Sequence, residues 1–191
     1  MNIEIHKAEI GSGIFLKWDY TQTDGLRKTK IKASADAPIH DDLRQAFEAL
    51  VPHFVLITEM KKKQDVVKAI DLKSIPEALL KKYKVTGVQI DDNKGDVSYT
   101  ISGYKILNTG KTVSFPTPKI RETASEDDKY EFLDKLIEQV EVIKDEVLEY
   151  MDGKEADREQ QSMDFGDDFN PQENQEEEGG VKDFIPAEEV A

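Results

Sequence analysis

The last part of this chain is the feature that most limits what it can fold into. Residues 151–191 contain 14 acidic and 3 basic side chains, whereas residues 1–150 contain 26 and 23. This segment is poor in aliphatic residues and rich in Glu, Gln, Asp and Gly, so it cannot bury enough apolar surface to offset the entropy lost on ordering. We therefore expect a disordered acidic tail over 154–191 and a single folded domain over 1–153, which is long enough to bury a core.

The lack of Cys and of long apolar runs limits the chemistry and the cellular location that we expect for this protein. The chain has no Cys, which removes disulfides, thiolate metal sites and cysteine nucleophiles. No apolar run approaches the roughly 18 to 20 residues that a membrane span needs. The N-terminal residues lack the basic segment and unbroken apolar stretch of a signal peptide. We expect a cytoplasmic protein without membrane contact.

The first third of the chain has the pattern of short strands. Strands are predicted over residues 2–10, 13–21 and 27–33, with a turn at Asp24-Gly25. In the second strand every other residue is apolar, which puts one set on a core face. That set is Ile14, Leu16, Trp18 and Tyr20. The three strands are expected to form a meander.

Helices and a hairpin follow. A helix from Asp41 is indicated by apolar residues at three- and four-residue spacing, and Pro52 should break or kink it. A shorter helix is predicted to begin at Ser74, because Glu77 completes a capping box. Residues 85–91 and 96–107 predict a hairpin, and a further short strand ends at Pro116.

The last helix is predicted over 126–151, with Ser125 as its N-cap. Its apolar residues repeat at steps of three and four; they are Leu133, Leu136, Val140, Ile143, Val147 and Tyr150. This run is shorter than the three or four heptads typical of a coiled coil. We expect the helix to pack on the chain's own sheet, and a homodimer through this helix is the alternative.

These elements predict an α+β fold. Its core is an antiparallel sheet of five to six strands with two main helices, followed by the acidic tail. A helix between a third and a fourth strand is also compatible with the OB-fold order, so an OB-like barrel is the alternative topology.

The sequence does not favour catalysis. His6, His40 and His53 lie far apart with no ligand spacing among them, so no metal site is predicted. No nucleophile and base converge in the sequence. We therefore expect no enzyme, no cofactor and no catalytic residue.

Four lysines and one aromatic residue form the candidate nucleic-acid-binding site. In the predicted meander they lie on the outward side of adjacent strands; they are Phe15, Lys17, Lys28, Lys30 and Lys32. Basic side chains that follow phosphates, with an aromatic ring that stacks on bases, hold single-stranded nucleic acid without sequence preference. The alternative is that these lysines keep the sheet surface hydrated and block edge pairing.

The acidic tail carries a further pattern. Residues 162–171, Ser-Met-Asp-Phe-Gly-Asp-Asp-Phe-Asn-Pro, resemble the acidic tip of bacterial single-stranded-DNA-binding proteins, and Asp-Phe-Ile-Pro at 183–186 is similar to the same tip. In that family the tip ends a disordered tail that docks on replication, recombination and repair enzymes. Some phage members place a similar tail after an OB-fold core. The family's final Phe carries the free carboxylate, whereas Phe169 is internal here.

The resemblance implies a set of partner-binding residues in the tail. They are Met163, Asp164, Phe165, Asp167, Asp168, Phe169, Phe184, Ile185 and Pro186. The body resembles small uncharacterised phage or prophage proteins. We expect a non-enzymatic single-stranded-DNA-binding or DNA-replication and recombination accessory protein of a phage or bacterium. The alternative is a protein-interaction or structural module of a mobile element, with a solubilising tail and no nucleic-acid binding.

Overall fold

A computed structural model describes residues 2–11, 14–72, 74–125 and 128–156. The chain divides into two compact units, Met1–Asp157 and Arg158–Ala191, and the description concerns the first. The acidic tail, with its expected disorder, lies outside the described residues.

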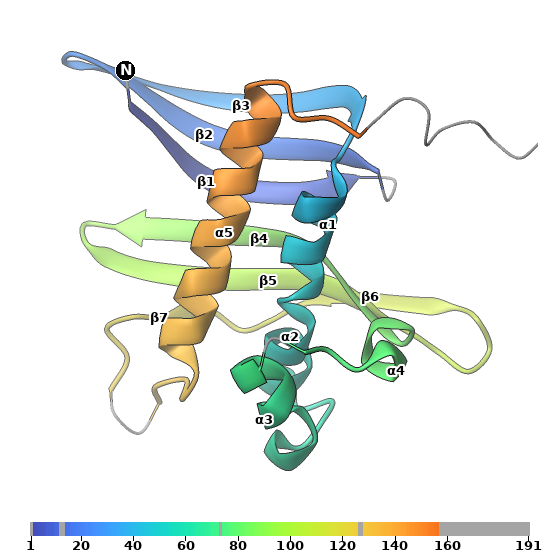
Figure 1. The fold of residues 1–191 in the computed structure, drawn as a ribbon. Coiled ribbons are helices and arrows are strands. Elements are labelled where there is room, and N and C mark those ends of the chain that lie inside the picture. The colour runs from blue at the N-terminus through green and yellow to red at the C-terminus, as the bar shows by residue number, and fades with distance from the viewer. Residues whose placement is uncertain (1, 12–13, 73, 126–127, 157–191) are drawn as a thin grey trace, which may run out of the picture. The chain divides into compact units, whose positions relative to one another are not determined.

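The first unit is built on one antiparallel sheet (Figure 1). Its strands are β1 (Asn2–Gly11), β2 (Phe15–Asp24), β3 (Arg27–Pro38), β4 (Tyr83–Asn93), β5 (Asp96–Ile106), β6 (Thr112–Pro116) and β7 (Ile120–Arg121). The strand order is β3-β2-β1-β4-β5-β6, and β7 pairs with β5. The predicted α+β class with an antiparallel sheet is confirmed. β3 and β6 end this order, so the described strands form an open sheet and not the OB-like barrel.

The predicted meander and hairpin are both present. β1 pairs with β2 and β2 with β3, and Gly25 takes a φ of +57° in the turn after Asp24. Such a φ strains any residue that has a Cβ, which explains the glycine. β4 and β5 pair from Tyr83 to Asn93, with Gly95 at a φ of +90° in the connecting turn.

Within the described residues five helices accompany the sheet, and their boundaries differ from the predictions. They are α1 (Asp41–Glu48), α2 (Val51–Ile57), α3 (Lys63–Leu72), α4 (Glu77–Leu80) and α5 (Leu133–Met151). Ala49 and Leu50 separate α1 from α2, and Pro52 lies in the first turn of α2, where a backbone N–H would have no partner within the helix. Sequence reasoning missed α3 altogether. The capping box at Ser74 is wrong, because α4 begins at Glu77 after Pro76.

The last helix starts later than predicted. α5 begins at Leu133 after Phe132, and Ser125 instead donates a 3.0 Å hydrogen bond to Asp128. Its six periodic apolar residues are all buried in the core of this chain. The prediction that this helix packs on its own sheet is confirmed, so the seam that would have joined a homodimer is already covered.

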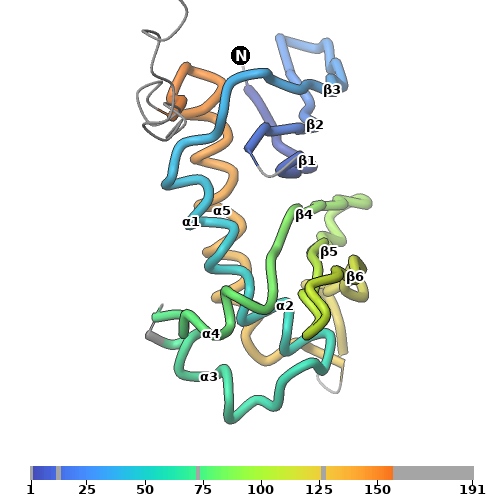
Figure 2. Tube along the Cα trace, turned by 90° about the vertical axis from the view of Figure 1, so that its right-hand side faces the viewer, coloured from blue at the N-terminus to red at the C-terminus, as the bar shows by residue number. Residues whose placement is uncertain are grey.

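The sheet and the helices form two layers (Figure 2). α1, α2 and α5 cover one face of the sheet, and the apolar core lies between them. The largest fully buried side chains come from both layers; among them are Leu16, Ile39, Phe47, Phe54, Ile101 and Leu136. None of the helices in the described ranges is long and apolar enough to cross a bilayer.

The end of α5 is fastened to the first elements of the chain. The Tyr150 hydroxyl donates a hydrogen bond to the carbonyl of Ala37, at the end of β3. Lys154 forms ion pairs with Asp42 at the start of α1 and with two glutamates of α5. These bonds fix α5 across one face of the sheet, and none of the described helices lies on the opposite face (Figure 2).

Candidate functional site on the open sheet face

The face of the sheet that carries no helix, called the open face below, holds the predicted lysines. In β2, Trp18 points to the helices, so its neighbours Lys17 and Asp19 point the other way. The β2–β3 register then sets Lys32 opposite Asp19. It also sets Lys30 and Lys28 opposite residues 21 and 23. All four lysines therefore share the open face, and all are exposed.

Phe15 does not join these lysines in one cluster. It is half-buried at the start of β2, opposite Gly11 and Pro38. Lys30 pairs with Thr21, six positions further along β2, which corresponds to about 20 Å at the rise of a strand. The structure thus separates Phe15 from Lys28 and Lys30, which lie near the start of β3.

The lysines differ in how far they are neutralised. Lys32 lies 3.6 Å from the carboxylate of Asp19, an exposed ion pair that contributes little stability. Lys17, Lys28 and Lys30 have no ion-pair partner within the described ranges. Three unneutralised ammonium groups on one solvent-facing surface attract anions.

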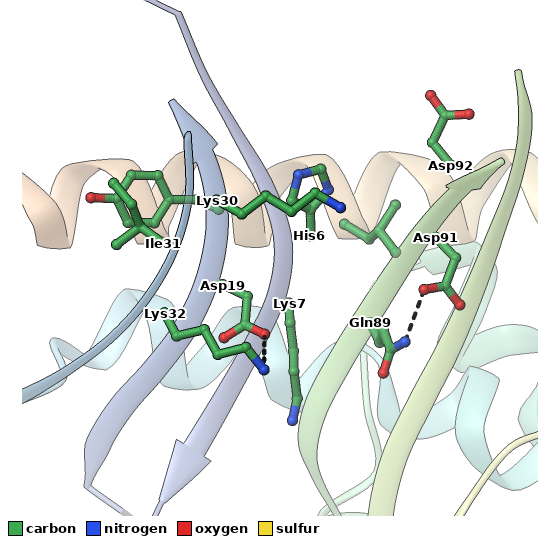
Figure 3. Close-up of a pocket in the computed structure, with 11 residues that line it drawn as sticks. His6, Lys7, Asp19, Lys30, Ile31, Lys32, Gln89, Asp91 and Asp92 are labelled. Carbon is green, nitrogen blue, oxygen red and sulfur yellow. Dashed lines mark hydrogen bonds and ion pairs between the residues drawn. The ribbon is translucent and has the colours of Figure 1, made fainter. Parts of the chain in front are cut away.

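A cleft on this face is lined by residues of β1, β2, β3 and β4 (Figure 3). β1 and β4 pair only from Lys7 to Glu9, opposite Gly87 to Gln89, although both strands are ten or more residues long. Beyond this short ladder a cleft of about 490 Å³ lies along the two strands. Its lining residues are His6, Lys7, Asp19, Tyr20, Lys30, Ile31, Lys32, Gln89, Ile90, Asp91 and Asp92.

The β4 side of the cleft carries a fixed carboxylate. Lys119 donates a 2.8 Å hydrogen bond to Oδ2 of Asp91, and Gln89 donates a 2.9 Å bond to Oδ1. The hydrogen bonds from Lys119 and Gln89 hold the pKa of Asp91 below its usual value. Asp91 is therefore ionised at neutral pH, and each of its oxygens keeps a second acceptor position.

The three histidines have separate structural surroundings. Nε2 of His6 lies 2.6 Å from Oγ1 of Thr21 on the open face, and the His40 side chain accepts a bond from the Asp42 amide at the start of α1. Nδ1 of His53 lies 2.9 Å from the Tyr130 hydroxyl, in the core. Within the described ranges no three metal-binding side chains are grouped.

Sequence reasoning missed the residues that β1 and β4 bring to the cleft. Lys7 alternates with Glu9 in β1, and this period of two was visible in the sequence. No comparable signal identified Gln89 and Asp91, because their position depends on the pairing of β4 with a strand about 80 residues earlier.

The predicted partner-binding residues of the tail, from Met163 to Pro186, lie outside the described residues. The candidate site is thus the open face with its cleft.

Comparisons with protein-family models, with curated proteins and with solved structures found no match to this chain.

Proposed function

We propose that this chain is a non-enzymatic accessory protein of DNA replication or recombination. It binds single-stranded DNA weakly through the open face, and its acidic tail recruits partner proteins. One observation carries the DNA-binding part of this proposal: Lys17, Lys28 and Lys30 are exposed on the helix-free face without carboxylate partners in the described structure.

The arrangement of these charges suits a flexible polyanion. Lys28, Lys30 and Lys32 are alternate residues of one strand, so consecutive side chains on the open face are about 7 Å apart. Lys17 extends the row onto β2, and it lines the same surface hollow as Lys32. Phosphates of a single strand can follow such a row without any base being read.

The open face also explains why the binding is weak. Its acidic residues include Glu9 and Asp19, which already pair with Lys7 and Lys32. The half-buried Phe15 is too far from Lys28 and Lys30 to stack a base that these lysines hold. Affinity then comes mainly from phosphate contacts, which added salt weakens.

The test is a titration of labelled single-stranded DNA with the full chain at several salt concentrations. Each phosphate contact should contribute about −0.7 to the slope of log affinity against log salt. The combined change Lys28→Gln, Lys30→Gln and Lys32→Gln should lower the affinity and flatten this slope. Absence of binding at low salt contradicts the proposal.

The matched control removes the same charge elsewhere. Lys61, Lys62 and Lys68 lie in and just before α3, away from the open face. Replacing these three by Gln should leave both affinity and slope close to the wild-type values. Equal losses in the two triple variants would mean that net charge, and not the open face, determines binding.

The recruiting role of the tail rests on its resemblance to the acidic tip of single-stranded-DNA-binding proteins. A peptide of residues 157–191 should bind bacterial replication or repair enzymes that recognise such tips. Replacing Phe165, Phe169 and Phe184 by Ala should abolish that binding. A peptide of the same composition in shuffled order is the control, and equal binding of both peptides would leave only a charge effect.

A second candidate function is supported by the edge of the sheet. β3 is 12 residues long and pairs with β2 on one side. Among the described residues, its other edge has contacts at its C-terminal end, where Tyr150 and Ala156 donate hydrogen bonds to the carbonyls of Ala37 and Pro38 and the following Ile39 bridges Glu155. Such an edge accepts an added strand from a partner protein. The DNA titration separates the two candidates, because a protein-interaction module would not bind DNA at low salt.

A further inference from the structure

The cleft between β1 and β4 has a chemistry that phosphate binding alone does not need. Ile90 and Tyr20, which belong to the apolar core or pack against it, are among its lining residues, as is Ile31, which pairs with Tyr20. β1 and β4 diverge after a ladder of three residue pairs, which opens the sheet beside Ile90. Apolar surface at the bottom of a polar cleft suits a flat, poorly hydrated ring.

The two sides of the cleft carry different charged groups: lysines together with Asp19 on one side, and Asp91, paired with Lys119, on the other (Figure 3). Lys7, Lys30 and Lys32 come from the β1–β3 side, and Asp91 comes from β4 together with Gln89. Lys32 lies 3.6 Å from the carboxylate of Asp19, whereas Lys30 has no ion-pair partner within the described ranges. A ligand that spans the cleft would need an anionic group at one end and hydrogen-bond donors at the other.

We propose that the cleft holds one cytosine nucleotide of the bound strand. Its phosphate lies against Lys30 and Lys32, its ring covers the apolar floor, and its 4-amino group donates to Asp91. This inference rests on the proposed single-stranded-DNA binding and adds a preference among bases to it.

Asp91 is what distinguishes cytosine from thymine. A carboxylate accepts hydrogen bonds and donates none when ionised, so it pairs with the amino group of cytosine. Thymine presents a carbonyl oxygen at the same ring position, and it cannot hydrogen-bond to Asp91 because both groups are acceptors. Lys119 and Gln89 hold the Asp91 carboxylate in place, so it cannot turn away without losing both bonds.

The test compares equal-length oligodeoxycytidylate and oligothymidylate at one salt concentration, with the full chain. Cytidylate should bind about five-fold more tightly or better, the lower end of what a specific base contact supplies. The change Asp91→Asn should bring the ratio of the two affinities close to one. The change Asp36→Asn removes the same charge from the open face outside the cleft and should preserve the wild-type ratio.

The lysines of the cleft provide a second measurement that does not depend on Asp91. Lys30→Gln with Lys32→Gln should weaken both oligonucleotides by the same factor, because phosphates are common to them. Wild-type binding without base preference, or an unchanged ratio in Asp91→Asn, overturns the cytosine site and leaves the proposed function standing. Failure of the wild-type chain to bind either oligonucleotide overturns both.

Discussion

The two faces of the sheet are made by the same strands, and neighbouring residues belong to different environments. In β2, Trp18 is buried and meets Tyr150 of α5 edge to face, with ring centres 5.9 Å apart. The next residue, Asp19, lies on the open face in an ion pair with Lys32. One face therefore sets the stability of the fold, whereas the other is open to change at little cost to stability. The following predictions test that division.

The largest effect is expected on the helix-covered face. Phe54 of α2 is fully buried, stacks on Phe115 at 5.1 Å between ring centres and packs against the backbone of Gly103. Phe54→Ala should lower the free energy of unfolding by about 3–5 kcal/mol, because it leaves a cavity in the core. Chemical denaturation measures this value. A loss below about 1 kcal/mol would show that this face is not tightly packed.

A pH effect should follow from the same buried layer. Burial, and secondarily the charge of Lys135, lower the pKa of His53 to about 4. An unfolded histidine takes up its proton near pH ~6.5. The stabilising contribution of neutral His53 is complete above this pH and is lost as the pH falls toward about 4. The stability lost over this pH interval is about 3 kcal/mol, because each unit of difference in pKa between the folded and unfolded states corresponds to about 1.4 kcal/mol.

His53→Gln tests this pH dependence. The variant keeps a polar group near Tyr130 and cannot take up a proton, so the difference in unfolding free energy between wild type and variant should change with pH. Relative to the variant, the wild type should lose stability between pH ~6.5 and ~4. Parallel curves for the two proteins over this interval would contradict the burial of His53.

A smaller loss is expected where the layers are joined. Tyr150→Phe keeps the aromatic contact with Trp18 and removes the hydrogen bond to the carbonyl of Ala37. The free energy of unfolding should fall by about 1–2 kcal/mol, because a partly buried acceptor loses its hydrogen-bond donor. Thermal unfolding followed by circular dichroism measures the change. No change would mean that water replaces the lost hydroxyl.

The smallest effect on stability is expected on the open face. The combined change Lys28→Gln, Lys30→Gln and Lys32→Gln should leave the free energy of unfolding within about 0.5 kcal/mol of the wild-type value, as is usual for exposed positions. The same variant is predicted to lose DNA affinity. A large loss of stability would show that this surface packs against something and is not open.

The sequence was informative where burial and periodicity coincide. The seam of α5 was predictable because each of its apolar residues, from Leu133 to Tyr150, faces one core. The lysines of β3 were predictable as one row because β2 and β3 are joined by a tight turn, which fixes the pairing.

Other features depended on tertiary context. α3 is a short helix whose buried residues include Val66 and Ile70, and its polar composition hid their spacing. Pro52 pointed to a kink, but a helix start accepts proline equally well. The cleft could not be predicted, because it arises where β1 meets β4, and a single sequence carries no signal for the pairing of distant strands.

The short ladder between β1 and β4 also bears on how the chain folds. The meander and the β4–β5 hairpin can each close through local turns on a microsecond timescale. Their junction must bring Ala8 to Val88 and requires the long intervening segment to be ordered first. Gly87 makes this junction close, since a Cβ there would lie 3.2 Å from the carbonyl oxygen of Ala8. We expect the amides of the meander and those of the β4–β5 hairpin to become protected from exchange separately during refolding. The pairing of β1 with β4 should be the late step.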